Sequence, residues 1–172
     1  MKRGIIAAFL IIGCFILQST VFRALDIGGI APNLLIILTS SFGFMRGEKT
    51  GMIIGFFCGL LADIFSGDVL GLYALMLMYI GYLNGKFSRI FYPEDIKLPA
   101  TLIILSDFMF GFACYVLMFL LRGRLQFGYY FMNIILPEIV YTVVLTIILY
   151  PLILLIDRRL TKGERRSARK FV

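Results

Sequence analysis

Apolar residues fill six runs of the chain, and short polar connections separate the runs. Four runs are close in length to the about 20 helical residues that cross a bilayer core of about 30 Å. The second and third runs are shorter, so local bilayer thinning or contact with a partner is expected to relieve the mismatch. The pattern predicts an all-α integral membrane protein, a six-helix transmembrane bundle. Its expected helices are about 4–22, 31–45, 51–65, 69–85, 98–121 and 132–156.

The connection between the second and third runs tests the number of helices. It reads Arg46-Gly47-Glu48-Lys49, and these charges would be costly to leave in lipid. Two helices joined by a solvated turn are therefore preferred to one buried re-entrant segment. The first run follows a basic start like that of a signal peptide, but it continues to Phe22 without a small-residue cleavage site. We therefore expect an uncleaved first helix.

The composition supports a membrane protein without a separate soluble domain. Hydrophobic residues make up 60% of the 172 positions, and the mean hydropathy is +0.95. Soluble domains average about 45–50% apolar residues. Nearly every residue belongs to an apolar run or to a short connection. We expect a single multi-pass membrane domain, 1–172, that ends in a basic cytoplasmic tail at 157–172.

The net charge of +7 is distributed between and after the apolar runs, which predicts contact with lipid headgroups rather than nucleic acid. If both termini are cytoplasmic, only Arg23, Arg122 and Arg124 of the seventeen basic residues lie outside, as the positive-inside rule favours. The tail is expected to meet anionic lipid or, alternatively, a cytoplasmic protein. Its basic residues are Arg158, Arg159, Lys162, Arg165, Arg166, Arg169 and Lys170. Histidine is absent and the cysteines are far apart, so no metal or cofactor is expected.

A row of glycines marks the third expected helix. Gly51, Gly55 and Gly59 recur at every fourth position, and Asp63 continues the row. Residues four apart share one face of a helix, and small residues on that face let two membrane helices approach closely. We therefore expect a packing face that accepts a neighbouring or partner helix. With the same spacing carried across the next turn, it consists of Gly51, Gly55, Gly59, Asp63, Gly67 and Gly71.

Five polar residues are expected in the outer half of the membrane. They are Gln18, Asn33, Asp63, Asp107 and Glu138. An acidic residue in a spanning segment is a candidate functional residue by default. Three interpretations stay open: a hydrogen-bonded patch that holds helices together, a docking site for a partner's basic or polar helix, and an outward-facing ligand cavity.

Some of these residues carry a more specific expectation. If Asp63 acts through hydrogen bonds, asparagine should replace it with little loss, because an amide also donates and accepts. If a charge is required instead, for example to pair with a partner's arginine, asparagine should fail as leucine does. Asp68 follows a turn signal and is expected to cap the fourth helix. Pro137 removes one helical hydrogen bond, which predicts an irregular backbone beside Glu138. An intramembrane aspartyl protease would show a Gly-x-Gly-Asp-like motif, and the chain has none, so no catalytic residue is expected.

Several stretches together resemble the MreD family of rod-shape-determining membrane proteins, over almost the whole chain. The most specific is GFFCGLLADIFSGDVLGLYAL at 55–75, followed by Gly81-Tyr82. A late proline-containing helix and a basic tail agree with it, whereas Glu138 is not part of the family pattern. The supporting motifs are Leu17-Gln18-Ser19-Thr20, Pro32-Asn33-Leu34 and Arg46-Gly47-Glu48-Lys49.

The resemblance implies a fold similar to the substrate-binding subunits of energy-coupling-factor transporters. It also implies a non-enzymatic scaffold of the cell-elongation complex in the bacterial cytoplasmic membrane. The implied partner is MreC, and the complex would support peptidoglycan synthases and communicate with MreB filaments. Membrane lipid and a second copy of the chain are further candidate contacts. The alternative is a substrate-binding subunit of a small-molecule transporter of the energy-coupling-factor type.

Overall fold

The computed structural model describes residues 2–22, 31–66, 70–89, 97–117 and 127–168. These residues are almost entirely helical and include no strand, which confirms the all-α class. Two stretches, η1 and η3, are π-helical. In chain order the elements are α1 (Lys2–Ile16), η1 (Leu17–Phe22), α2 (Leu34–Arg46), α3 (Glu48–Ser66), α4 (Leu72–Phe87), α5 (Lys97–Tyr115), α6 (Phe127–Tyr130), η3 (Phe131–Ile135) and α7 (Leu136–Ala168).

Within the part of the chain that the structure describes, three stretches are long and apolar enough to cross a membrane: Gly4–Val21, Lys97–Tyr115 and Gly128–Arg159. α2 is apolar but shorter. Large apolar side chains such as Phe9 and Leu75 are 75% and 62% exposed on the outside of the bundle, as a lipid-facing surface requires. That all six expected helices cross the bilayer stays a prediction.

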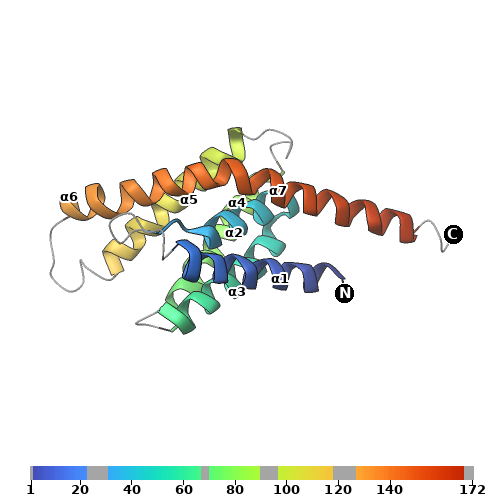
Figure 1. The fold of residues 1–172 in the computed structure, drawn as a ribbon, viewed down its shortest axis with the longest axis horizontal. Coiled ribbons are helices and arrows are strands. Elements are labelled where there is room, and N and C mark those ends of the chain that lie inside the picture. Colours follow the sequence, from blue (N-terminus) through green and yellow to red (C-terminus); the bar gives the residue numbers. More distant parts are fainter. Residues whose placement is uncertain (1, 23–30, 67–69, 90–96, 118–126, 169–172) are drawn as a thin grey trace.

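α2 is the centre of the bundle, and the other helices surround it (Figure 1). Every residue from Leu34 to Phe44 is buried. A helix that is apolar on all sides is covered on all sides by protein. The short length of α2 therefore requires no bilayer thinning, because α2 presents almost no surface to lipid.

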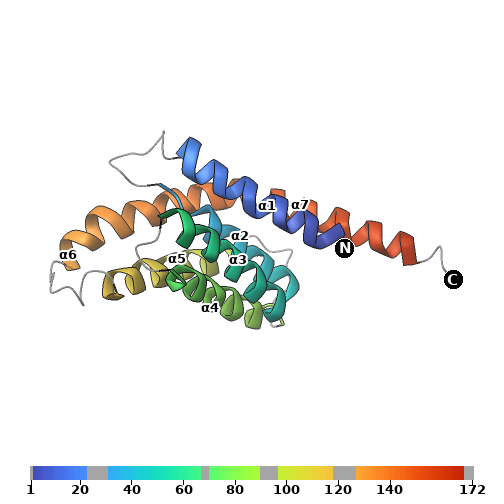
Figure 2. The same cartoon turned by 90° about the horizontal axis from the view of Figure 1, so that it is seen from below.

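Both termini lie at one end of the bundle. The start of α1 and the end of α7 lie at the same end in both views (Figures 1 and 2). We call the opposite end, where α2 and α4 begin and α3 and α5 finish, the outer end. The shared end of the termini agrees with an even number of crossings, and its cytoplasmic location stays a prediction.

α7 is longer than the apolar run that predicted it. The run ends at 156, but the helix continues to Ala168, because helical hydrogen bonds do not require apolar side chains. Its 33 residues span about 50 Å, more than the about 30 Å of a bilayer core. At the other end the helical backbone begins at Phe127, five residues before the expected start.

An ion pair joins α2 to α7 at the point beyond which α7 extends out of the bundle. Arg46, the last residue of α2, forms an ion pair with Asp157 of α7, and both side chains are largely buried. The Arg46 guanidinium also lies over the Phe42 ring, 5.3 Å from its centroid. Beyond this pair, Arg158 and Arg159 are exposed, and α7 projects past the start of α1 (Figure 1).

Candidate functional site

The glycine row of α3 packs against the backbone of α4. Gly55 faces the carbonyl group of Leu77, and a Cβ atom at position 55 would lie 2.7 Å from that carbonyl carbon. Gly59 faces Ala74 in the same way, with 2.5 Å between a Cβ atom and the Ala74 nitrogen. Real Cβ atoms do not approach so closely, so any side chain at these positions would separate the two helices.

The same seam includes glycines from both neighbours of α3. Gly51 faces Gly81 of α4, and a Cβ atom at Gly43 of α2 would lie 2.7 Å from the Gly81 carbonyl oxygen. Gly85 faces the start of α3 at Glu48. The packing face that the spacing predicted is therefore filled by the chain's own α4. The face cannot bind a helix of a partner protein, because α4 already covers it.

Asp63 continues the row and binds the beginning of α4. Its carboxylate accepts hydrogen bonds from the backbone N–H groups of Gly71 (3.0 Å), Tyr73 (3.0 Å) and Ala74 (2.9 Å). The first N–H groups of a helix have no partner within the helix, so Asp63 supplies the cap from the preceding helix. Asp68, the expected cap, lies outside the described residues, as does Gly67.

Gly71 does not extend the packing face. Its φ is +95°, a left-handed conformation that favours glycine, and nothing lies within 4 Å of a Cβ atom built there. Its role is to turn the chain into α4 while its N–H donates to Asp63.

Gln18 and Asn33 perform a similar task at the beginning of α2. The Asn33 side-chain oxygen accepts the N–H of Ile36, and the Gln18 side-chain oxygen accepts the N–H of Leu35, each at 3.3 Å. The Asn33 N–H in turn donates to the hydroxyl of Thr142 on α7, also at 3.3 Å. These contacts join η1, α2 and α7 at the outer end.

A cavity of about 180 Å³ lies between the two capped helix starts. Gln18 and Asn33 contribute polar groups from the α2 side, and Tyr73, whose N–H binds Asp63, contributes from the α4 side. The remaining lining is apolar: Phe15, Leu35, Ala62, Leu77 and Phe110. Three of the five predicted outer-half residues thus line this cavity or contact its wall.

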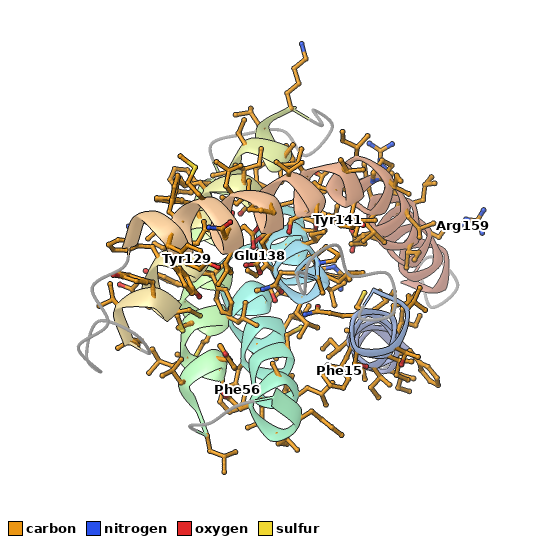
Figure 3. The ribbon with its side chains drawn as sticks, turned by 60° about the vertical axis from the view of Figure 1, so that its left-hand side comes forward. Phe15, Phe56, Tyr129, Glu138, Tyr141 and Arg159 are labelled. Atoms are coloured by element: carbon orange, nitrogen blue, oxygen red, sulfur yellow. The ribbon has the colours of Figure 1, made fainter. Side chains whose placement is uncertain are left out.

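Asp107 and Glu138 do not line this cavity, but they lie close to each other and near Asn33 and Thr142. Asp107 is 2% exposed, and neither of its carboxylate oxygens has a hydrogen-bond partner among the described residues. The Thr142 side chain lies beside it, and Glu138 is close enough for the two carboxyl groups to interact electrostatically. Glu138 also neighbours Asn33. Figure 3 shows Glu138 on α7, where this helix crosses the start of α2.

The backbone beside Glu138 is irregular, as Pro137 predicted. Residues 131–135 are π-helical, and the N–H of Leu136 bonds to the carbonyl oxygen of Phe131, five residues earlier. π-Helical turns are frequent at functional sites. This turn sets the direction from which Glu138 reaches the start of α2.

Sequence reasoning missed a polar network deeper in the bundle. The side-chain nitrogen of Asn84 on α4 lies 2.7 Å from the Ser106 hydroxyl on α5 and 3.3 Å from the Ser40 hydroxyl on α2. Asn84 lies near the end of a largely apolar helix, and a polar residue at this position could have indicated a buried hydrogen-bonding group. Thr142 gave no signal, because threonine is common in apolar helices and its partner is 109 residues away.

The basic tail is described in part. Arg158 and Arg159 are exposed on α7, and the positions of Lys162, Arg165 and Arg166 also belong to this helix. Arg169 and Lys170 lie outside the described residues. The continuous helix places the tail's first twelve residues on a projecting arm rather than an irregular tail.

The family model for "rod shape-determining protein MreD" matches residues 2–159, which is nearly the whole chain. The chain belongs to the MreD family. This membership assigns it a role in determining rod shape and agrees with helices that can cross a membrane. No curated protein and no solved structure gives a significant match. The likeness to transporter substrate-binding subunits therefore stays a prediction.

Proposed function

We propose that this MreD-family protein is a non-enzymatic membrane scaffold of the bacterial rod-shape complex. It would bind MreC on its outer side and support peptidoglycan synthesis during cell elongation. The observation that carries the proposal is the family match over residues 2–159. A scaffold needs a rigid body with distinct surfaces, and the glycine seam and the capped helix starts supply that rigidity.

The hydrogen bonding of Asp63 supports a scaffold over a protease. In a carboxylate dyad, one carboxyl group must be free to accept a proton from water. Both oxygens of Asp63 already accept backbone N–H groups. Asp63 therefore holds the beginning of α4 and has no free oxygen to accept a proton from water.

The basic arm at the end of α7 is the proposed cytoplasmic contact. Exposed Arg158 and Arg159 lie just beyond the Arg46–Asp157 ion pair. Basic residues next to a spanning helix attract the anionic inner leaflet, and a rigid arm could also reach MreB or an associated protein.

The outer cavity favours one alternative function, the substrate-binding subunit of a small-molecule transporter. A space of about 180 Å³ with polar groups from the α2 side and the α4 side could hold a small ligand. A transporter subunit would also require an energy-supplying ATPase partner.

Purification of the tagged chain in mild detergent, followed by mass spectrometry, separates the two functions. The scaffold predicts co-purification of MreC and cell-wall synthases, with untagged membranes as the control. It also predicts that cells depleted of the protein lose their rod shape. Recovery of ATPase subunits together with a tightly bound small molecule would instead support the transporter.

A further inference from the structure

Asp107 is the least satisfied polar group among the described residues of the bundle. Its side chain is 98% removed from solvent, yet neither oxygen has a hydrogen-bond partner there. Burial of a carboxyl group without partners is costly, and buried charges in proteins are normally paired. Either a proton on the carboxyl group or a group outside the described residues must therefore offset this cost.

A second carboxyl group, that of Glu138, lies near Asp107 and adds negative charge to the same site. It lies within electrostatic reach of Asp107, and two adjacent carboxylates repel each other unless a cation or a shared proton relieves them. Asn33 and Thr142 adjoin the pair, and the Thr142 hydroxyl accepts the Asn33 N–H, which leaves its own proton able to point toward Asp107. Neither residue supplies a positive charge.

The pair is approachable from the outer end. Glu138 is partly exposed, and Figure 3 shows it on the outer part of α7 beside α2. Asn33, its neighbour, also lines the outer cavity, and so does Phe110, one helical turn beyond Asp107 on α5. Asp107 and Glu138 do not line this cavity, so a long side chain that enters beside Asn33 would have to displace part of the cavity wall to contact them.

The chain offers no cation from its own membrane segments. None of the six expected spans contains a lysine or an arginine. Among the described residues, the basic side chains belong to the inner ends of the helices, such as Arg46, Lys86 and Lys97. The only basic residues expected on the outer side, Arg23, Arg122 and Arg124, lie outside the described residues.

We propose that Asp107 and Glu138 form a receptor for one lysine or arginine side chain of a second membrane protein, inserted from the outer end. This inference rests on the scaffold function and names the chemistry by which the scaffold recognises its partner. The aliphatic stem of such a side chain suits the apolar wall at Phe110, and its charged head suits the carboxylate pair. The partner segment must therefore carry a basic residue at the outer membrane boundary.

Charge reversal tests the receptor in the intact complex. The chain is co-expressed with the single-pass partner MreC, and the recovered partner is quantified after mild-detergent purification. Glu138→Lys should reduce recovery about tenfold or more, because truncation or reversal of a desolvated charge pair costs several kcal/mol. Asn133→Lys is the matched control, since Asn133 is exposed near the outer end and its side chain donates to the Tyr129 carbonyl oxygen one turn earlier. Its recovery should equal that of the wild type.

Rescue identifies the partner's residue. Each lysine or arginine of the partner's outer membrane-proximal segment is changed to aspartate in the Glu138→Lys background, and one of these changes should restore recovery. Equal recovery for Glu138→Lys and Asn133→Lys would overturn the receptor, and so would the absence of any restoring change. If the wild type itself recovers no partner, the scaffold function fails together with the receptor.

Two further variants exclude other sources of the cation. Glu138→Gln and the triple variant Arg23→Gln/Arg122→Gln/Arg124→Gln are compared by thermal unfolding of the purified chain. If both variants lose the same stability, and the variant that combines all four changes loses no more, an arginine of this chain pairs with the carboxyl groups. That result would overturn the proposal. A small cation is tested with millimolar ethylamine or guanidinium. The proposal is overturned in favour of a small cation if these compounds stabilise the wild type but not Glu138→Gln, and if Glu138→Lys recovers as much partner as the wild type.

Discussion

Two aspartates of the bundle, Asp63 and Asp107, have the same burial and opposite surroundings. Each is 2% exposed and lies in an apolar helix. Asp63 accepts three backbone N–H groups, whereas neither oxygen of Asp107 has a partner among the described residues. The number of satisfied hydrogen bonds, rather than burial, therefore separates a structural carboxylate from a candidate recognition group.

The helices around the two aspartates differ in the same way. α3 and α4 meet backbone to backbone along the glycines, and Asp63 closes the end of that seam. α5 meets η3 and α7 through larger side chains: a side-chain atom of Ile135 in η3 lies 3.2 Å from the position that a Cβ atom at Gly111 would take. The first region leaves no room for a partner, and the second holds an incomplete polar site. A partner is thus expected to act on the second region.

The largest expected effect comes from a side chain in the glycine seam. Gly59→Leu would place atoms on the backbone of α4 near Ala74, and overpacking of a close-packed core is destabilising. We expect loss of folded, monodisperse protein after detergent extraction. Phe56→Leu is the control on the same helix, because Phe56 is 41% exposed and faces outward. A Gly59→Leu protein that folds and unfolds like the wild type would contradict the role of the seam.

The next effect concerns Asp63. Asp63→Leu removes the acceptor of three backbone N–H groups, each costing about 1–3 kcal/mol when left unsatisfied. We expect a clearly lower thermal midpoint and faster hydrogen exchange at the amides of Tyr73 and Ala74.

Asp63→Asn should fall between the wild type and the leucine variant. The amide keeps only one acceptor oxygen, and its NH₂ group would face a backbone N–H. Because both oxygens of Asp63 accept N–H groups, the geometry predicts a larger loss for asparagine than the sequence pattern did. Slow exchange at the start of α4 in both variants would show that Asp63 does not cap this helix.

The seam shows what a sequence pattern can and cannot predict. The four-residue spacing of Gly51, Gly55 and Gly59 predicted a close-packed face on one side of a helix. The spacing carries no information about which helix lies opposite, and the occupant is the chain's own α4. Likewise, Asp63 was recognised as pointing toward protein, but its partners lie 8 to 11 residues later, beyond any local capping pattern.

The outer polar residues show a similar limit. Asn33 is recognisable as a cap, because it follows Pro32 and begins an apolar run. Its neighbours Thr142 and Glu138 come from a helix more than 100 residues later, so their meeting depends on how the helices pack. The end of α7 was mispredicted because hydropathy marks where lipid contact ends, whereas helical hydrogen bonding continues to Ala168.

The smallest expected effect on stability, and the sharpest test of the comparison, comes from Asp107→Leu. Replacement of an unpaired buried carboxyl group by an apolar side chain removes a desolvation penalty, so the thermal midpoint of the isolated chain should be unchanged or slightly raised. Asp107→Asn, which keeps the shape, controls for the larger volume of leucine. Partner recovery should nevertheless fall in both variants, because the receptor loses one of its two charges. If Asp107→Leu destabilises the isolated chain as much as Asp63→Leu does, Asp107 has a structural partner in the free protein, and the two aspartates do not differ in the way proposed.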